Sequence, residues 1–303
     1  MIHSTVPPAR FRRPRIALVG FGDVAARIQA QRGAVWGQSP LAPRILGVSR
    51  SKGWDLDDRR QCRRLAACAS HWIILVPPSD QPANGTTDRR SKMLTLALRA
   101  KRNRASTFRL RSVYISTTGV YGDHGGARVS ETHATKTRQP RSLRRLHAER
   151  LWRSLGGHVL RVPGITAEDR LPLERIRNAS PALRPEDDVF TNHIHANDLA
   201  RLCWAALWRG RPARITNTVM PVHLKMGDYF DCIADAFGLP RGPRISREEM
   251  ALAVREGRVS PMMASFMQDS RQVSGRRISE LRVKLHYERV EQFIHRSAHS
   301  APR

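Results

Sequence analysis

A short aliphatic run that leads directly into two spaced glycines constrains the fold of this chain more than any other feature. Arg15–Val19 (RIALV) has the composition of a buried parallel strand. A G-x-G-x-x-A turn follows it, and a helical pattern begins within that turn. Such glycines permit a tight turn and let a pyrophosphate approach the backbone, while the alanine lets helix and strand pack closely. We therefore expect a dinucleotide at the start of the helix, contacted by Gly20, Phe21, Gly22, Asp23 and Val24.

Strand and helix patterns alternate along the chain after this turn. Further buried strands are predicted at Arg44–Val48, Trp72–Val76, Ser112–Ser116 and His158–Val162, with helices at Met93–Ala100 and Arg141–Leu155. Alternation at this spacing predicts an α/β protein with a Rossmann-type doubly wound parallel sheet. In the second half, helices are predicted at Leu199–Leu207, at Met226–Phe237 with a stop at Gly238, and in the methionine-rich segment Ser260–Gln272.

The residue after the second strand bears on the choice of dinucleotide. An acid there bonds the ribose 2′-hydroxyl of NAD, whereas an arginine accommodates the 2′-phosphate of NADP. The chain has Arg50 at this point and no acid before Asp55, which favours NADP over NAD. Asp23 is unusual beside a pyrophosphate, because it would repel the phosphates. We expect its side chain to turn away and cap the helix.

The charge of the chain is strongly positive. Its 303 residues carry a formal net charge of +27, and all but six of the 53 basic residues are arginine. The arginines are spread over strands, helices and tails, without an aromatic-interleaved RNA motif or a zinc-finger spacing. We interpret them as a compositional bias and expect no specific nucleic-acid partner. Salt-sensitive binding to polyanions in vitro is still expected.

Other classes of protein are disfavoured by what the sequence lacks. No apolar run reaches 18 residues, and residues 1–14, predicted to be a disordered basic tail, lack the apolar segment of a signal peptide. The four cysteines show no metal or redox spacing. We therefore expect a cytoplasmic protein with no membrane partner and no metal.

Seven segments of the chain share their pattern with one known family: VGFGDVAARI (Val19–Ile28), GVSRS (Gly47–Ser51), VPP (Val76–Pro78), YISTTGVYGDHGG (Tyr114–Gly126), LRVPGI (Leu160–Ile165), RLPLERI (Arg170–Ile176) and TNHIHANDLA (Thr191–Ala200). They resemble extended short-chain dehydrogenase/reductases, specifically an atypical branch of NAD-dependent epimerase/dehydratase proteins. The resemblance implies a NAD(P)-binding Rossmann domain over 15–165, a small C-terminal substrate lobe over 166–295 from which 189–217 returns to the first domain, and a tail over 296–303. It also implies a cofactor over the C-terminal strand ends, in contact with Pro77 and Pro163.

The catalytic pair of that family is missing here. A Ser or Thr shortly before the V-Y-G loop polarises the substrate oxygen in the family, and the resemblance gives that position to Thr117. The proton-transferring Tyr-x-x-x-Lys pair lies on the next helix. Counted back from the helix glutamate, here Glu149, its positions hold Arg141 and Arg145. An arginine cannot act as a general acid or base near pH 7, because its pKa exceeds 12. Arg145 could still hydrogen-bond a nicotinamide ribose.

Three functions stay open at this point, and we favour the first. The chain is an oxidoreductase or epimerase for a sugar-nucleotide-like or small carbonyl substrate, with its acid relocated to Tyr121 or His124 and with Arg141 holding an anionic substrate. Alternatively, it is a non-catalytic NAD(P)-binding sensor, or it binds nucleic acid through its charge. The structural alternatives are that Tyr121 packs its loop and that His124 is merely exposed. A homodimer is compatible with the sequence.

The segment TNHIHANDLA resembles the family's passage from a strand to a helix beside the substrate. The resemblance implies that four residues line or brace the substrate wall: Asn192, His193, His195 and Asp198. His193 and His195 alternate on a predicted strand and so point the same way, but no third ligand has a matching spacing, and we predict no metal. Asp198 has an equally plausible role as the cap of the following helix.

Overall fold

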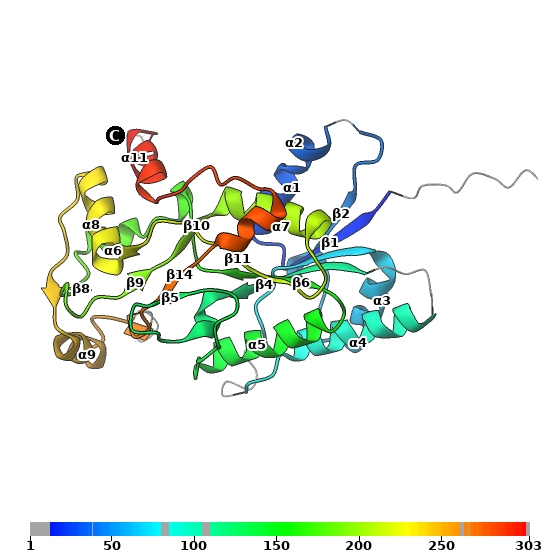
Figure 1. The fold of residues 1–303 in the computed structure, drawn as a ribbon, viewed down its shortest axis with the longest axis horizontal. Helices are drawn as coiled ribbons and strands as arrows, with labels where there is room; N and C mark the ends of the chain where they lie inside the picture. Colours follow the sequence, from blue (N-terminus) through cyan, green and yellow to red (C-terminus); the bar gives the residue numbers. More distant parts are fainter. Residues whose placement is uncertain are drawn as a thin grey trace, which may run out of the picture.

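Six parallel strands form the central sheet of the computed structural model, which describes residues 13–37, 39–79, 85–104, 110–260, 264–265 and 267–300. Their order across the sheet is β2 (Arg44–Val48), β1 (Arg15–Val19), β3 (His71–Ile74), β4 (Arg111–Thr117), β6 (His158–Val162) and β11 (Ile215–Asn217). The chain leaves β1 on one side to form β2 and returns on the other to form β3, so the strand order reverses beside β1 (Figure 1). Ligands of open α/β sheets bind at the carboxyl ends of the strands at such a switch point.

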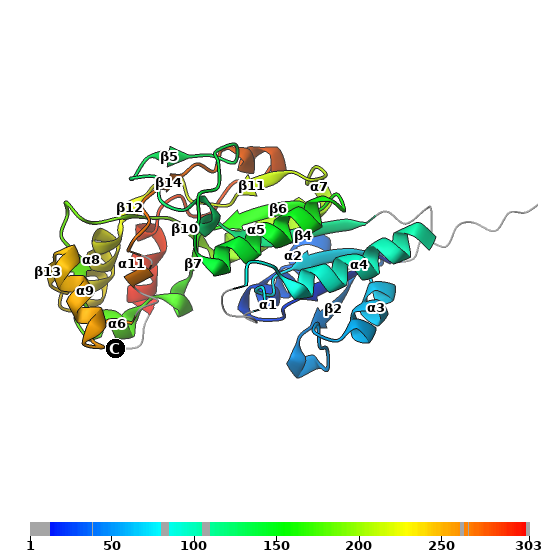
Figure 2. The ribbon, with the colours of Figure 1, turned by 90° about the horizontal axis from the view of Figure 1, so that it is seen from below.

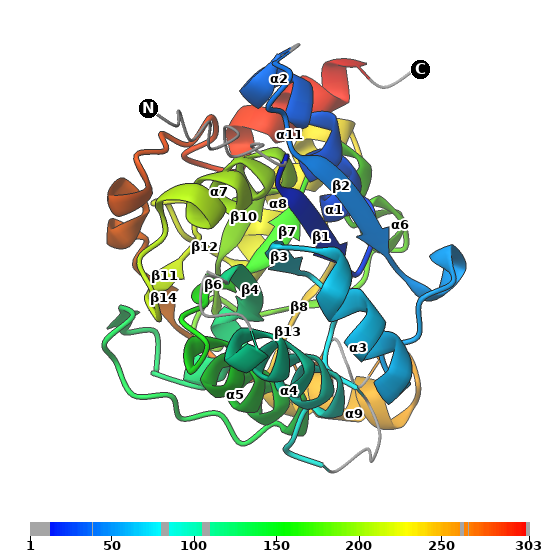
Figure 3. The same cartoon turned by 90° about the vertical axis from the view of Figure 1, so that its right-hand side faces the viewer.

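Helices cover both faces of the sheet, as Figure 3 shows. One face carries α1 (Asp23–Ala30) and α7 (Ala196–Arg209), and the other carries α3 (Arg59–Cys68), α4 (Arg89–Arg104) and α5 (Pro140–Arg153). Alternate residues of a strand point to opposite faces. Ile16 and Leu18 of β1 accordingly pack in the core beneath α1 and α7, while Ala17 and Val19 pack in the core beneath the other three helices. This doubly wound arrangement confirms the predicted fold class.

A smaller lobe with an apolar core of its own lies beyond the carboxyl ends of the strands (Figures 1 and 2). Its helices are α6 (Leu173–Arg177), α8 (Met226–Phe237), α9 (Arg247–Arg255) and α11 (Glu291–Ser300). Ile233, Phe293 and Ile294 are fully buried at its centre. Two short strand pairs join it: β8 (Ala182–Leu183) with β13 (Arg244–Ile245), and β9 (Phe190–Thr191) with β12 (Leu224–Lys225).

Short elements link the two parts of the molecule. The paired strands are β7 (Gly164–Thr166) with β10 (His193–His195), and β5 (Arg128–Val129) with β14 (Gln272–Val273). The remaining elements are α2 (Arg32–Trp36) and the 3-10 turns η1 (Arg50–Lys52), η2 (Thr118–Tyr121), η3 (Glu168–Arg170) and η4 (Arg276–Leu281). No helix among the described residues is long and apolar enough to cross a membrane.

Several predicted segments differ from the structure in their bounds, and two differ in the kind of structure they form. The methionine-rich segment is not a helix over Met267–Gln272, and its residues 261–263 and 266 lie outside the described part. Its end is extended because β14 pairs with β5 and because the Asp123 carboxylate accepts a hydrogen bond from the Ser270 N–H at 2.8 Å. At the C-terminus, α11 continues to Ser300 where a tail was expected, since it packs on the lobe core. The expected N-terminal tail lies almost wholly outside the described residues.

Candidate functional site

The glycine turn between β1 and α1 combines one sterically required glycine with one that leaves open space. Gly20 has φ +94°, and a Cβ built on it would lie 2.4 Å from the Val76 backbone nitrogen. Only glycine tolerates both constraints. A Cβ on Gly22 would meet no atom within 4 Å, so the backbone there is open to an approaching group. Gly22 also precedes the first residue of α1, whose N-terminal N–H groups have no partners within the helix.

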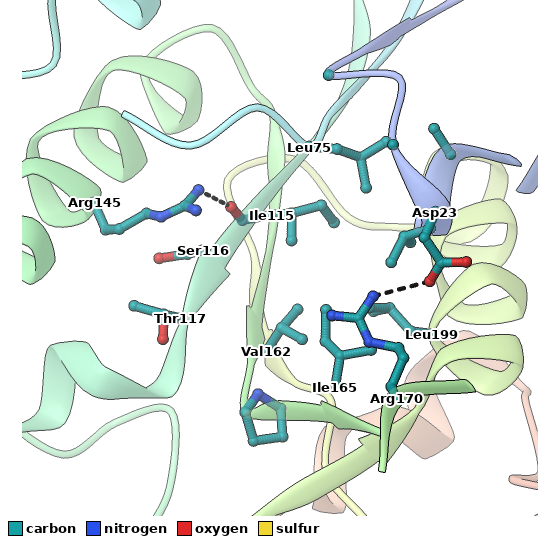
Figure 4. Close-up of a pocket in the computed structure, with 15 residues that line it drawn as sticks. Asp23, Leu75, Ile115, Ser116, Thr117, Arg145, Val162, Ile165, Arg170 and Leu199 are labelled. Carbon is teal, nitrogen blue, oxygen red and sulfur yellow. Dashed lines mark hydrogen bonds and ion pairs between the residues drawn. The ribbon is translucent and has the colours of Figure 1, made fainter. Parts of the chain in front are cut away.

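This turn forms one wall of a cavity of about 310 Å³ at the switch point (Figure 4). The opposite wall comes from the carboxyl end of β4, including Ser116 and Thr117, and from Val162 at the end of β6 and Pro163 after it. A second cavity, of about 630 Å³, adjoins the first and extends under the lobe. Five residues line both cavities: Thr117, Arg145, Pro163, Ile165 and Arg170. We call the first the turn cavity and the second the lobe cavity.

Asp23 lies on the wall of the turn cavity with its charge compensated. It is the first residue of α1, and the cap position belongs to Gly22, so the expected capping role is wrong. The Asp23 carboxylate accepts hydrogen bonds from Arg27 and Arg170, each at 2.9 Å. Partial burial acts to raise the pKa of Asp23, but these two guanidinium groups outweigh it and lower the pKa. Figure 4 shows Arg170 reaching across the cavity to Asp23.

Thr117 and Arg145 line both cavities, whereas Arg141 lines only the lobe cavity. The Thr117 Oγ1 accepts a hydrogen bond from the Gly119 N–H at 3.1 Å, which leaves its hydroxyl proton to donate toward the cavity. Arg145 donates to the Ile115 carbonyl at 2.7 Å (Figure 4). Arg141 lines the lobe cavity and donates to Gln139 and Ser265, at 2.9 and 3.2 Å. That Arg141 and Arg145 occupy the positions of the family's Tyr-Lys pair stays a prediction.

Tyr121 lies outside both cavities, in a buried polar network. Its side chain is fully buried, and its hydroxyl donates to the Asn217 carboxamide oxygen at 2.8 Å. Burial raises the pKa of Tyr121, and the guanidinium of Arg161 lies 4.9 Å from its ring centroid. Tyr121 therefore lines neither the turn cavity nor the lobe cavity.

His124 is also separate from the site where Thr117 and Arg145 meet. Its ring lies 6.4 Å from the ring of His133, which lines a third cavity on the far side of β5 and β14. Partial burial and the nearby Lys136 lower the pKa of His124. The structure thus brings neither proposed acid, Tyr121 or His124, to Thr117.

Of the four residues expected at the substrate wall, two line the lobe cavity. Asn192 braces the wall by donating to the Arg271 carbonyl at 2.9 Å and accepting from the Val273 N–H at 2.8 Å. His193 stacks on Tyr229, with ring centroids 4.3 Å apart, and burial lowers the pKa of His193 to about 4.

His195 lines neither cavity. It is fully buried against Tyr287, and its Nδ1 accepts from the Asn197 N–H at 3.2 Å, which caps α7. Asp198 is therefore not the cap, and it lines neither cavity. Its carboxylate instead accepts from the backbone N–H groups of His286 and Tyr287, at 2.9 and 3.1 Å.

The lobe cavity is rich in arginine, which the sequence did not indicate. Six arginines line it, with Asp269 as its only acid among the described residues: Arg141, Arg144, Arg145, Arg170, Arg175 and Arg271. Burial lowers the pKa of Arg175 to about 10 and also lowers the pKa of Arg271. The free-energy cost of keeping each buried guanidinium charged falls when an anion enters the cavity, because the anion stabilises the charged form. Tyr229 and Phe230 of α8 add aromatic surface.

Three further residues predicted to contact a dinucleotide, Arg50, Phe21 and Pro77, do not line the turn cavity. Arg50 follows β2 with its side chain 74% exposed, paired with Asp57 at 3.1 Å, and it lines neither cavity. Phe21 also lines neither, and its ring lies 4.6 Å from the Lys52 ammonium. Pro77 lines the lobe cavity. Among the described residues no three His, Cys, Asp or Glu side chains gather as metal ligands.

No protein-family model matches the sequence, and no curated protein matches it. Solved structures do. One is a functionally unknown protein from Silicibacter pomeroyi, 25% identical, with a TM-score of 0.72 over 95% of this chain and 99% of that chain. Another is the dTDP-glucose 4,6-dehydratase DesIV from Streptomyces venezuelae with NAD and DAU bound, 15% identical, with a TM-score of 0.69 over 94% and 95%. A third is RMD from Pseudomonas aeruginosa complexed with NADPH, 16% identical, with a TM-score of 0.66 over 94% and 96%.

The chain has the fold of the NAD-dependent epimerase/dehydratase proteins. This confirms the fold that the seven sequence segments implied. The likeness spans both parts of the molecule, the parallel sheet and the smaller lobe, since it covers at least 94% of the chain in each of the three structures.

Proposed function

We propose that this chain binds NAD(P) in the turn cavity and acts as an oxidoreductase or epimerase on an anionic carbonyl or sugar-nucleotide-like substrate held in the lobe cavity. The observation that carries the proposal is the open backbone at Gly22, at the start of α1 and at the switch point of the sheet. A pyrophosphate fits this place because helix N-termini supply unpaired N–H groups and a favourable dipole. When bound, the nicotinamide supplies the hydride donor or acceptor.

Arg170 and Arg27 compensate the negative charge of Asp23, which lies beside the expected position of the phosphates. Both guanidinium groups pair with Asp23, and Arg27 also pairs with Asp169 at 2.7 Å, so a pyrophosphate entering at Gly22 meets a cluster of two cations and two carboxylates rather than a lone acid. We propose NADP over NAD, because the exposed Arg50 and the adjacent Lys52 are both long enough to turn toward a 2′-phosphate. The test is a pair of calorimetric titrations with NADP and with NAD, in which NADP should bind more tightly.

The catalytic part of the proposal rests on Thr117, Arg141 and Arg145. Thr117 would donate its hydroxyl to the substrate oxygen at the junction of the two cavities, while Arg141 and Arg145 would hold the anionic part. Another group must accept the proton when the substrate is oxidised or supply it when the substrate is reduced. Tyr121 could serve only if its bond to Asn217 opened, and His124 only if its loop moved. His193 and Tyr229 already line the lobe cavity, and neutral His193 could accept a proton there.

A non-catalytic NAD(P)-binding sensor is the second candidate, favoured by one observation. Where the cavities meet, the described residues that line both include no histidine, carboxylate or tyrosine. Hydride turnover separates the two candidates. An enzyme should turn over at least one nucleotide sugar or small ketone and lose rate in Thr117→Val, whereas a sensor should bind the dinucleotide firmly with no turnover of any substrate.

A further inference from the structure

The three helices on one face of the sheet form an unusually basic surface. Helices α3, α4 and α5 hold four, seven and five Lys or Arg residues, sixteen in all, within 40 of the 303 residues. Their one acid is Glu149, which is buried and paired with Arg161 at 2.8 Å. An even spread of the 53 basic and 26 acidic residues would give these helices about seven bases and three acids. The arginines that look dispersed along the sequence are therefore concentrated in space.

Many of these cations are exposed to solvent and form no ion pair with a carboxylate of the described residues. Nine are exposed and take part in no ion pair within the part of the chain that the structure describes: Arg59, Arg60, Arg63, Arg64, Arg89, Lys92, Arg102, Arg150 and Arg153. We call this set the helical basic face. Arginines elsewhere are more often neutralised, as in the pairs Arg241 with Asp235 and Arg244 with Asp231.

The three helices lie side by side, so the cations form one continuous surface. Figure 3 shows α3, α4 and α5 together beneath the sheet, and Figure 2 shows the same helices along their length. At 1.5 Å per residue, the 16 residues of α4 extend for about 24 Å. A DNA duplex presents about 14 phosphates over that distance, one per ~1.7 Å of axis. The size of the surface therefore suits a polymer of phosphates rather than a single anion.

The same features argue against other occupants. A second copy of the chain would bring two basic faces together, and like charges repel. Leu96 is the only large apolar side chain exposed on these helices among the described residues, whereas protein interfaces usually have an apolar centre. The cations that line the lobe cavity, Arg141, Arg144 and Arg145, belong to the other side of α5 and are not part of the helical basic face.

We propose that the helical basic face binds the phosphate backbone of nucleic acid without reading its sequence. Such binding needs cations at the spacing of phosphates and no base contacts, and it weakens steeply with salt. The inference does not depend on the dinucleotide site, because the glycine turn and both cavities use other residues. It assigns the excess positive charge of the chain to a definite surface.

The test must separate this surface from the net charge of the whole protein. Two triple variants with equal net charge do so. The face variant carries Arg63→Gln, Lys92→Gln and Arg150→Gln, one from each helix, and the lobe variant carries Arg177→Gln, Arg255→Gln and Arg289→Gln. All six side chains are exposed and have no ion pair among the described residues. Fluorescence anisotropy with two labelled 20-base-pair duplexes of unrelated sequence, titrated from 50 to 300 mM salt, gives Kd and its salt dependence for each protein.

We expect both duplexes to bind the parent equally, with a steep salt dependence. The face variant should bind about 10- to 100-fold more weakly near 150 mM salt, and its log–log slope should be shallower by about 2 to 3, since each lost phosphate contact removes about 0.9. The lobe variant should stay within about twofold of the parent. Equal losses in both variants would mean that only total charge matters and would overturn the proposal. So would binding to vesicles of anionic phospholipid without binding to the duplexes.

Discussion

Breaking the buried pair between Glu149 and Arg161 should destabilise the protein strongly. The Glu149 carboxylate accepts hydrogen bonds from Arg161 at 2.8 and 3.1 Å and from the Ser116 hydroxyl at 2.5 Å. Glu149 and Arg161 are 2% and 4% exposed, so neither charge can turn to water. In Glu149→Leu, Arg161 keeps its positive charge, because the guanidinium of an arginine does not deprotonate in proteins.

The expected cost follows from that geometry. Three hydrogen bonds to a charged group would contribute about 1.5–3 kcal/mol each, but burial of the two ions offsets much of this. Removal of one partner from such a pair usually costs about 3–5 kcal/mol, mostly for the charge left without a partner. Glu149→Leu should therefore lower the free energy of unfolding by about 4 kcal/mol. The double variant Glu149→Leu with Arg161→Met should recover at least half of that loss.

Urea unfolding followed by circular dichroism measures the free energy of unfolding of the single and the double variant. Glu174→Leu is the control for the loss of an acid at an exposed position. A loss below about 1 kcal/mol in Glu149→Leu would contradict the reasoning. Strict additivity of the two substitutions would contradict it as well, because residues in one buried network should couple.

Three further outcomes are expected. Arg50→Ala should weaken NADP binding by about 1–2 kcal/mol, about 5- to 30-fold, and leave NAD unchanged in calorimetry, as for loss of a charge-assisted contact; an equal loss for both dinucleotides would refute the NADP assignment. Thr117→Val should lower any hydride turnover by 10-fold or more while dinucleotide affinity stays constant, and full turnover in this variant would place the active site elsewhere. Burial lowers the pKa of His193 from 6.5 to about 4 in the fold, so the neutral ring contributes stability above pH 6.5 that is lost as pH falls toward 4. His193→Gln should remove up to about 3 kcal/mol of this acid sensitivity in unfolding curves taken from pH 7 to pH 4, and an unchanged pH dependence would refute the assignment.

The strands of the sheet could be predicted because their signal is local. Three of the five predicted strands, Arg15–Val19, Arg44–Val48 and His158–Val162, begin and end at the predicted residues, and so does the helix Met226–Phe237. An aliphatic run bounded by glycine or polar residues leaves few alternatives in a buried parallel sheet. The glycine turn was equally readable because G-x-G-x-x-A is a local pattern, although the contact that excludes a side chain at Gly20 comes from the distant Val76 backbone.

The lobe cavity and the position of Tyr121 could not be read in this way. Tyr121 is fixed by Asn217, which is 96 residues away in the sequence. The arginines of the lobe cavity come from α5, from the segment after β7 and from the loop before β14, and no spacing in the sequence links them. The helical basic face was missed for a similar reason, since only the packing of α3, α4 and α5 brings its cations together. Long-range packing decides these features, and a single sequence does not encode it in any local pattern.

The binding of a dinucleotide at the glycine turn is tested most directly by Gly22→Val. A Cβ at Gly22 would meet no protein atom within 4 Å, so the fold should be retained while the added side chain blocks the approach of the pyrophosphate. Gly33→Val is the matched control, because Gly33 lies in α2, also faces open space and lines neither cavity. In calorimetric titrations with NADP, the parent and Gly33→Val should bind with equal affinity and Gly22→Val should show no binding. Retained affinity in Gly22→Val, or no binding by the parent, would contradict a dinucleotide site at this turn.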